Sequence, residues 1–116
     1  MSTTSGGTPS SKLAAELAAL DNNVYGFIHN ALDLESLARS FAQQSWASRR
    51  SAWDEYEITC SWCQLNLFDS GGMPKFAGVV EPTRVDELAD TLRSFDVDYE
   101  IELYDVKGEL IRTLLP

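Results

Sequence analysis

The last twenty residues of the chain, residues 97–116, constrain its fold more than any other stretch. They read VDYEIELYDVKGELIRTLLP, in which apolar and polar residues alternate, break at residues 105–108 and alternate again. Such alternation around a glycine-bearing turn predicts a β-hairpin. Strand side chains point alternately to opposite faces, so one face of the first strand is predicted to be buried. The other face displays three acids and a tyrosine: Asp98, Glu100, Glu102 and Tyr104.

The rest of the second half is predicted to contain two further strands and one helix. Alternation over residues 55–62 indicates a half-buried strand, and a β-bulge near residues 61–63 would absorb the change of parity that follows. A glycine-rich turn precedes another strand over residues 75–80. Pro82 then opens a helix whose apolar residues recur at three- and four-residue spacing.

The first half of the chain has helical spacing throughout. Apolar residues between positions 13 and 28 recur every three or four residues, which predicts a helix, a break and a second short helix through about Ala31. Asp33 is a suitable N-cap for another helix over residues 34–50. Two tryptophans seven residues apart are predicted to lie in the core on its buried side: Trp46 and Trp53.

These patterns together predict an α+β fold. N-terminal helices precede a β-β-α-β-β unit, whose four strands form a mainly antiparallel sheet with the helices on one face. Residues 1–11 are almost all Ser, Thr, Gly and Pro and are predicted to be a disordered tail, whereas residues 12–116 form a single α+β domain. Neither a membrane span nor a secretory signal is recognisable, so we expect a cytoplasmic protein.

The net charge of −9 belongs entirely to the second half of the chain. Residues 1–53 hold four basic and four acidic groups, whereas residues 54–116 hold five basic and fourteen acidic groups. Such a surface repels nucleic acid and anionic membranes and speeds encounter with a basic partner. The alternative interpretation is that the charge serves only solubility.

Cys60 and Cys63 form the only motif-like spacing. Two thiols could ligate zinc, but a structural site needs four ligands and His29 would supply only one more. Inside strand-like sequence the pair is better interpreted as two buried thiols. The alternative is a zinc site shared across a dimer.

We find no set of residues that indicates catalysis. His29 lacks a nucleophile in its neighbourhood, and Asp33 could orient it only if a helix ran through both. Glu100 and Glu102 would lie about 7 Å apart on one strand, but a glycosidase needs its carboxylates across a cleft. We therefore expect no enzymatic activity, no cofactor and no resident metal.

The acidic row of the C-terminal hairpin is the predicted partner-binding site. Glu55 and Glu57 are expected to join it from a neighbouring strand. Aromatic residues interleaved with acids, as in protein-binding hot spots, complete the predicted site: Trp53, Tyr56 and Tyr104.

In charge and size, though in no motif, the chain resembles the small acidic immunity proteins that neutralise secreted bacterial nuclease toxins. This resemblance implies an antitoxin that occludes the active site of a basic toxin. An alternative is a phage-encoded inhibitor that mimics nucleic acid to block a defence complex, and a third is a small metal-binding regulator based on the cysteines. The last strand, predicted over residues 109–115, could pair with a partner or with a second copy as a homodimer.

Overall fold

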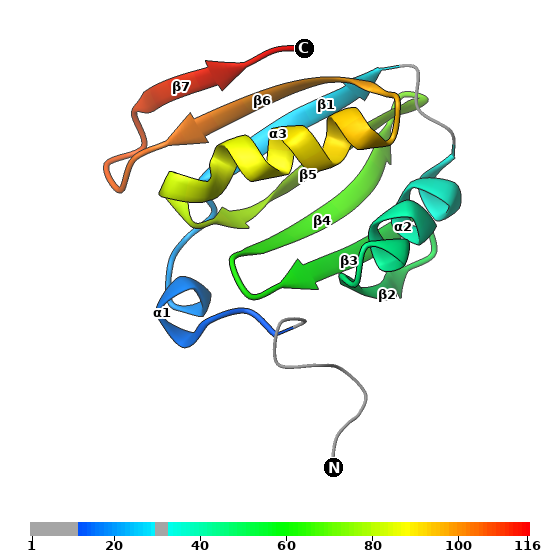
Figure 1. Cartoon of the computed structure of the whole chain (residues 1–116), viewed down its shortest axis with the longest axis horizontal. Coiled ribbons are helices and arrows are strands. Elements are labelled where there is room, and N and C mark those ends of the chain that lie inside the picture. The colour runs from blue at the N-terminus through cyan, green and yellow to red at the C-terminus, as the bar shows by residue number, and fades with distance from the viewer. Residues whose placement is uncertain (1–11, 30–32) are drawn as a thin grey trace.

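The computed structural model describes residues 12–29 and 33–116, which form one antiparallel sheet with helices packed on it (Figure 1). The sheet has seven strands in the spatial order β2-β3-β4-β5-β1-β6-β7. The strands are β1 (Val24–His29), β2 (Ala47–Ala52), β3 (Glu55–Cys60), β4 (Cys63–Ser70), β5 (Met73–Val80), β6 (Asp98–Tyr104) and β7 (Leu110–Leu114). The helices are α1 (Ala15–Ala18), α2 (Leu34–Gln43), the 3₁₀ helix η2 (Pro82–Arg84) and α3 (Val85–Ser94). The predicted tail, residues 1–11, and Ala31 lie outside the described residues.

Helices α2 and α3 cover one face of the sheet and enclose the core. Figure 1 shows α3 crossing in front of the central strands and α2 in front of β3. In β1, β3, β4 and β6, inward-facing buried residues alternate with exposed or half-buried ones, as a sheet covered on one face requires. Strand β5 alternates in the same way until its last three residues, which are all buried. The helices contribute the largest apolar side chains opposite them: Leu37, Phe41, Leu88 and Leu92.

The prediction of a four-stranded sheet is wrong, although the broad α+β class holds. Three strands were missed or merged: β1 and β2 were predicted as helix, and β3 and β4 were predicted to be one strand with a bulge. Each error has a separate physical cause.

Strand β1 was predicted as helix because both of its faces carry apolar side chains. Val24 and Ile28 point into the core, whereas Tyr25 and Phe27 point to the other face. A short run that is apolar on both sides fits helical spacing as well as strand alternation. The strand is central, and Gly26 lets the ring of Phe76 pack directly over it.

Helix α2 begins where predicted and ends seven residues early. Asp33 is its N-cap, since its Oδ1 accepts a 2.8 Å hydrogen bond from the Ser36 backbone N–H, which lowers the pKa of Asp33. The helix ends at Gln43, and Ser45 adopts a positive φ of 73° that redirects the chain into β2. Trp46 is buried against Phe41, as predicted for a core residue.

Residues 60–63 form a tight hairpin, and the predicted β-bulge there is wrong. Cys60 and Cys63 are directly paired across two antiparallel strands, with Ser61 and Trp62 as the two-residue turn between them. Neither turn residue is a glycine or asparagine, which are the usual signals of such a turn. The change of parity in the sequence marks this reversal of chain direction.

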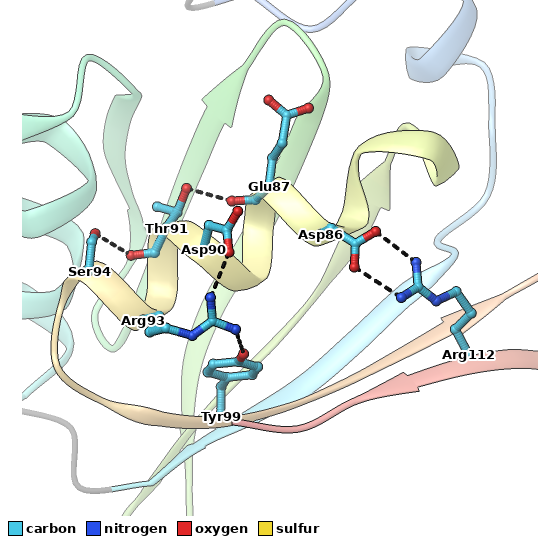
Figure 2. Close-up of polar contacts among 8 residues, drawn as sticks. All are labelled: Asp86, Glu87, Asp90, Thr91, Arg93, Ser94, Tyr99 and Arg112. Atoms are coloured by element: carbon cyan, nitrogen blue, oxygen red, sulfur yellow. Dashed lines mark hydrogen bonds and ion pairs between the residues drawn. The ribbon is translucent and has the colours of Figure 1, made fainter.

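The C-terminal part of the fold agrees with its prediction. Pro82 opens η2 and α3, and residues 98–114 form the expected hairpin, with Gly108 at a φ of 82° in its turn. Two ion-paired arginines connect α3 to this hairpin (Figure 2). Arg93 bridges Asp90 and the hydroxyl of Tyr99 on β6, and Arg112 on β7 binds Asp86 through two hydrogen bonds of 2.9 and 3.0 Å.

Candidate protein-binding face

The candidate site is the sheet face that α2 and α3 leave uncovered, which we call the open face. Helix α1 covers only one end of it: Leu17 is buried, and Leu13, Leu17 and Ala18 line a small cavity with Gln64, Asn66 and Val79 of the open face. Strand pairing places the open-face side chains in rows that cross the sheet. One row runs Glu57–Asn66–Ala77–Tyr25–Glu102, and the next runs Glu55–Phe68–Lys75–Phe27–Glu100.

Strand β6 forms one margin of these rows and carries the predicted acids. Asp98, Glu100 and Glu102 all point to the open face, because Tyr99, Ile101 and Leu103 between them are buried in the core. Across the part of the chain that the structure describes, neither Glu100 nor Glu102 forms an ion pair with a cation. Among the described residues, their charge is therefore not neutralised by an ion pair.

Tyr104 completes this β6 margin. Its hydroxyl donates a 3.1 Å hydrogen bond to the Glu102 carboxylate, which, together with burial, raises the pKa of Tyr104. The Tyr104 ring meets the ring of Tyr25 edge-on, with centroids 5.5 Å apart. The margin is thus continuous with the aromatic side chains of β1.

Glu55 and Glu57 lie on the open face but not on a strand next to the acidic row. Strand β3 is separated from β6 by β4, β5 and β1, which places the two groups of acids about 19 Å apart at a strand spacing near 4.8 Å. Arg49 forms a 3.3 Å ion pair with Glu57, and Gln64 donates to the same carboxylate. The β3 acids therefore form a second, partly neutralised margin.

Two of the predicted aromatic residues lie away from the open face. Tyr56 points to the opposite face, because it alternates with Glu55 and Glu57, and packs against the core. Trp53 was predicted to be core and is 85% exposed in the turn between β2 and β3. The Arg50 guanidinium stacks on its ring, 5.1 Å from the centroid, so Trp53 covers an arginine at the β2 edge.

The centre of the open face was missed by the sequence interpretation. Tyr25 and Phe27 come from β1, Phe68 from β4, and Lys75 from β5 lies between Phe68 and Phe27 in one row. The Lys75 ammonium lies 4.9 Å from the centroid of the Phe27 ring. Once β1 is recognised as a strand, its alternation places Tyr25 and Phe27 on the face opposite Val24 and Ile28.

The cysteine pair lies in the core, apart from this face. Cys63 is fully buried and Cys60 nearly so, and both belong to the side of the sheet under the helices. His29 lies on the open face and pairs with Asp98. It is the last residue of β1, and the β3–β4 turn that holds the cysteines lies beyond the opposite end of β1, so His29 does not approach the thiols. Within residues 12–29 and 33–116, no three His, Cys, Asp or Glu side chains are grouped closely enough to hold a metal ion.

Burial makes both thiols unreactive. It raises the pKa of Cys60 and raises the pKa of Cys63 well above its usual value, and only the thiolate attacks an alkylating reagent. We expect iodoacetamide at neutral pH to modify Cys63 at least about 10³-fold more slowly in the folded protein than in urea, since its modification requires unfolding. Mass spectrometry of each cysteine peptide measures this ratio, and rapid labelling of native Cys63 would show that the hairpin opens locally.

Comparison with known proteins returned no match to a family model, to a curated protein or to a solved structure. Among the described helices, none combines the length and the apolar character needed to cross a membrane.

Proposed function

We propose that this chain is a small cytoplasmic binding protein, most specifically an immunity protein that neutralises a basic toxin such as a nuclease. The observation that carries the proposal is that two acids without an ion pair among the described residues, Glu100 and Glu102, lie beside an aromatic centre on one face of a rigid sheet. The acids attract and orient a basic partner, and the aromatic side chains supply apolar contact area that becomes buried on binding. We propose binding, and no catalysis, as the function of this face.

The layout of the open face defines the partner that it fits. The carboxylates of Glu100 and Glu102 are suited to bind lysine or arginine side chains of the partner, such as those that line the substrate groove of a nuclease. Tyr25 and Phe27 lie immediately beside these acids, so the same partner needs an apolar or aromatic contact about one strand spacing away, close to 5 Å. A protein surface offers this combination, in which charge controls the association rate and apolar burial slows dissociation.

Charge reversal on the β6 margin tests the proposal. The variant Glu100→Lys/Glu102→Lys changes the net charge from −9 to −5, and so does a control, Asp54→Lys/Asp69→Lys, at exposed sites away from β6. We expect the β6 variant to associate with the partner at least about 10-fold more slowly at low salt, and the control to keep most of the rate. Equal rates for both variants would mean that net charge alone governs binding and that the open face is not the contact.

The partner can be identified by affinity capture: the tagged chain is used to retain proteins from cells that carry its gene, and the capture is repeated over a series of salt concentrations. An immunity protein is expected to retain one basic protein in equal amounts, with recovery falling as salt rises. Expression of that protein alone should arrest growth, and co-expression of this chain should relieve the arrest. Capture of a nucleic-acid-binding defence complex that this chain inhibits would instead favour the alternative function, a nucleic-acid mimic.

A further inference from the structure

The two edges of the sheet differ in chemistry. Strand β2, at one edge, has the sequence ASRRSA, and all six residues are exposed. Two arginines and an irregular register after Arg50 interrupt its ladder, and Arg50 folds back onto Trp53. Charged side chains and bulges are the devices by which natural sheets prevent a further strand from pairing. The β2 edge is therefore protected.

Strand β7, at the other edge, is less protected: its register with β6 also shifts, between Leu103 and Tyr104, but it carries one charged residue where β2 carries two. It pairs with β6 on one side only, and its apolar side chains remain in solvent: Leu110 is 50% exposed and Ile111 is 51% exposed. The single charged residue of the strand, Arg112, is turned toward α3 and neutralised by Asp86 (Figure 2). Strand β7 thus combines exposed apolar side chains on its faces with a backbone edge that pairs with no other strand of the sheet.

The apolar surface continues from β7 around the end of the sheet. Val106 in the β6–β7 turn is 94% exposed, and Leu20 and Leu115 are exposed as well. Leu20, Val106 and Ile111 line an open cavity of about 640 Å³ at this end. Of the eight large hydrophobic side chains exposed in the described part of the chain, four therefore belong to this end, namely Leu20, Val106, Leu110 and Ile111, whereas Leu115 follows β7 at its other end. Such concentration marks an interaction surface, whereas scattered exposed residues do not.

Local charge indicates which partner this surface accepts. Residues 105–116 hold two acids, Asp105 and Glu109, and two bases, Lys107 and Arg112. Because Arg112 pairs with Asp86, the local net charge with Asp86 included is −1, in a chain of net charge −9. A basic partner gains little attraction here. A second copy of the chain, itself at −9, meets the least repulsion at this segment. A twofold interface also requires a self-complementary surface, and an apolar edge strand meets this requirement because it packs against its own apolar side chains.

From these observations we propose that β7 pairs with β7 of a second copy, antiparallel across a twofold axis, so that two seven-stranded sheets join into one. An antiparallel pairing of this kind keeps both open faces on the same side of the joined sheet. The two β6 margins then lie three strand spacings apart, roughly 14 Å. This inference does not depend on the proposed function, because the dimer contact is the β7 edge and not the β6 acids. Dimerisation is also expected to respond to salt in the opposite direction from binding of a basic partner.

Sedimentation equilibrium of the full chain tests the proposal. We expect the molar mass to rise from 12.9 kDa toward twice that value with concentration, and the dimer to persist or strengthen from low to high salt as repulsion between the acidic chains is screened. The variant Ile111→Lys should weaken the dimer at least about 10-fold, because it buries an unpaired charge at the edge. Its exposed position leaves the fold intact, which circular dichroism verifies. The matched control, Ala52→Lys on the β2 edge, should leave the dimer unchanged.

Three results would overturn the proposal. The first is a wild-type chain that stays monomeric up to about 1 mM in both salt conditions, where even a weak interface is populated. The second is a dimer that survives Ile111→Lys or is lost in Ala52→Lys. The third is a dimer that dissociates as salt rises, since that requires attraction between opposite charges. Binding of a basic partner, in contrast, is expected to weaken with salt, so the two surfaces are distinguished in one series.

Discussion

Replacing Gly78 by alanine is expected to destabilise the fold more than replacing any other glycine of the sheet by alanine. Gly78 lies in β5 between Leu65 of β4 and Val24 of β1, at the centre of the seven strands. A Cβ at this position would collide with the backbone carbonyl of Gln64 and come within 2.9 Å of the Leu65 Cα. Backbone atoms cannot rotate away as a side chain can, so β4 and β5 must separate to admit the methyl group.

We expect Gly78→Ala to lower the free energy of unfolding by at least about 3 kcal/mol, the upper part of the range for overpacked cores. This is a large fraction of the 5–15 kcal/mol typical of a domain. Urea denaturation followed by tryptophan fluorescence measures the loss. The matched control is Gly71→Ala in the β4–β5 turn, where a Cβ meets no atom within 4 Å and only the positive φ of 63° opposes it. That control should cost about 1 kcal/mol, and equal losses for the two variants would contradict the steric argument.

The second large effect is expected at Asn23, the one buried polar side chain in the described part of the chain. Its Nδ2 donates to the Val80 carbonyl and its Oδ1 accepts from the Val80 N–H, both at 2.9 Å. Its backbone N–H also donates to Gly78 and its carbonyl accepts from Tyr104. The residue therefore joins β5, β1 and β6 at the end of the sheet, where regular strand pairing stops.

Truncation by Asn23→Ala removes both side-chain hydrogen bonds and leaves the N–H and carbonyl of Val80 buried without partners. Each unsatisfied buried group costs about 1–3 kcal/mol, so we expect a total loss of about 2–4 kcal/mol. Thermal and urea unfolding measure it, with Asn22→Ala as the control because Asn22 is exposed. If the two variants lost equal stability, the amide pairing at Val80 would contribute nothing to the fold.

The proposed partner face and the proposed dimer edge use adjacent strands and meet at Tyr104, which lines the cavity beside Ile111. Strand β6 presents its acids from the flat face of the sheet, whereas β7 presents an unpaired backbone from its edge. A dimer would therefore double the acidic face available to one partner or to two. The Glu100→Lys/Glu102→Lys protein tests whether the two surfaces act separately. Sedimentation equilibrium is expected to show that it dimerises at least as well as the wild type.

The sequence by itself determined the elements whose patterns are local. The β6–β7 hairpin follows from strict alternation around Gly108, and α3 follows from Pro82 and an uninterrupted amphipathic stripe. The Asp33 cap is a contact over three residues. That the β6 acids share one face, opposite the buried side chains, was also predictable, because alternation along one strand fixes which side chains share a face.

Only the tertiary structure decided how distant segments combine. Strand β1 is apolar on both faces, so its own sequence does not distinguish a helix from a central strand, and pairing with β5 and β6 makes the choice. Strand β2 has no large apolar residue to mark a face and exists because its backbone pairs with β3. The insertion of β1 between β5 and β6 also separates Glu55 and Glu57 from the β6 acids and places Tyr25 and Phe27 between them. Strand order depends on backbone hydrogen bonds between segments far apart in the chain, which local periodicity does not encode.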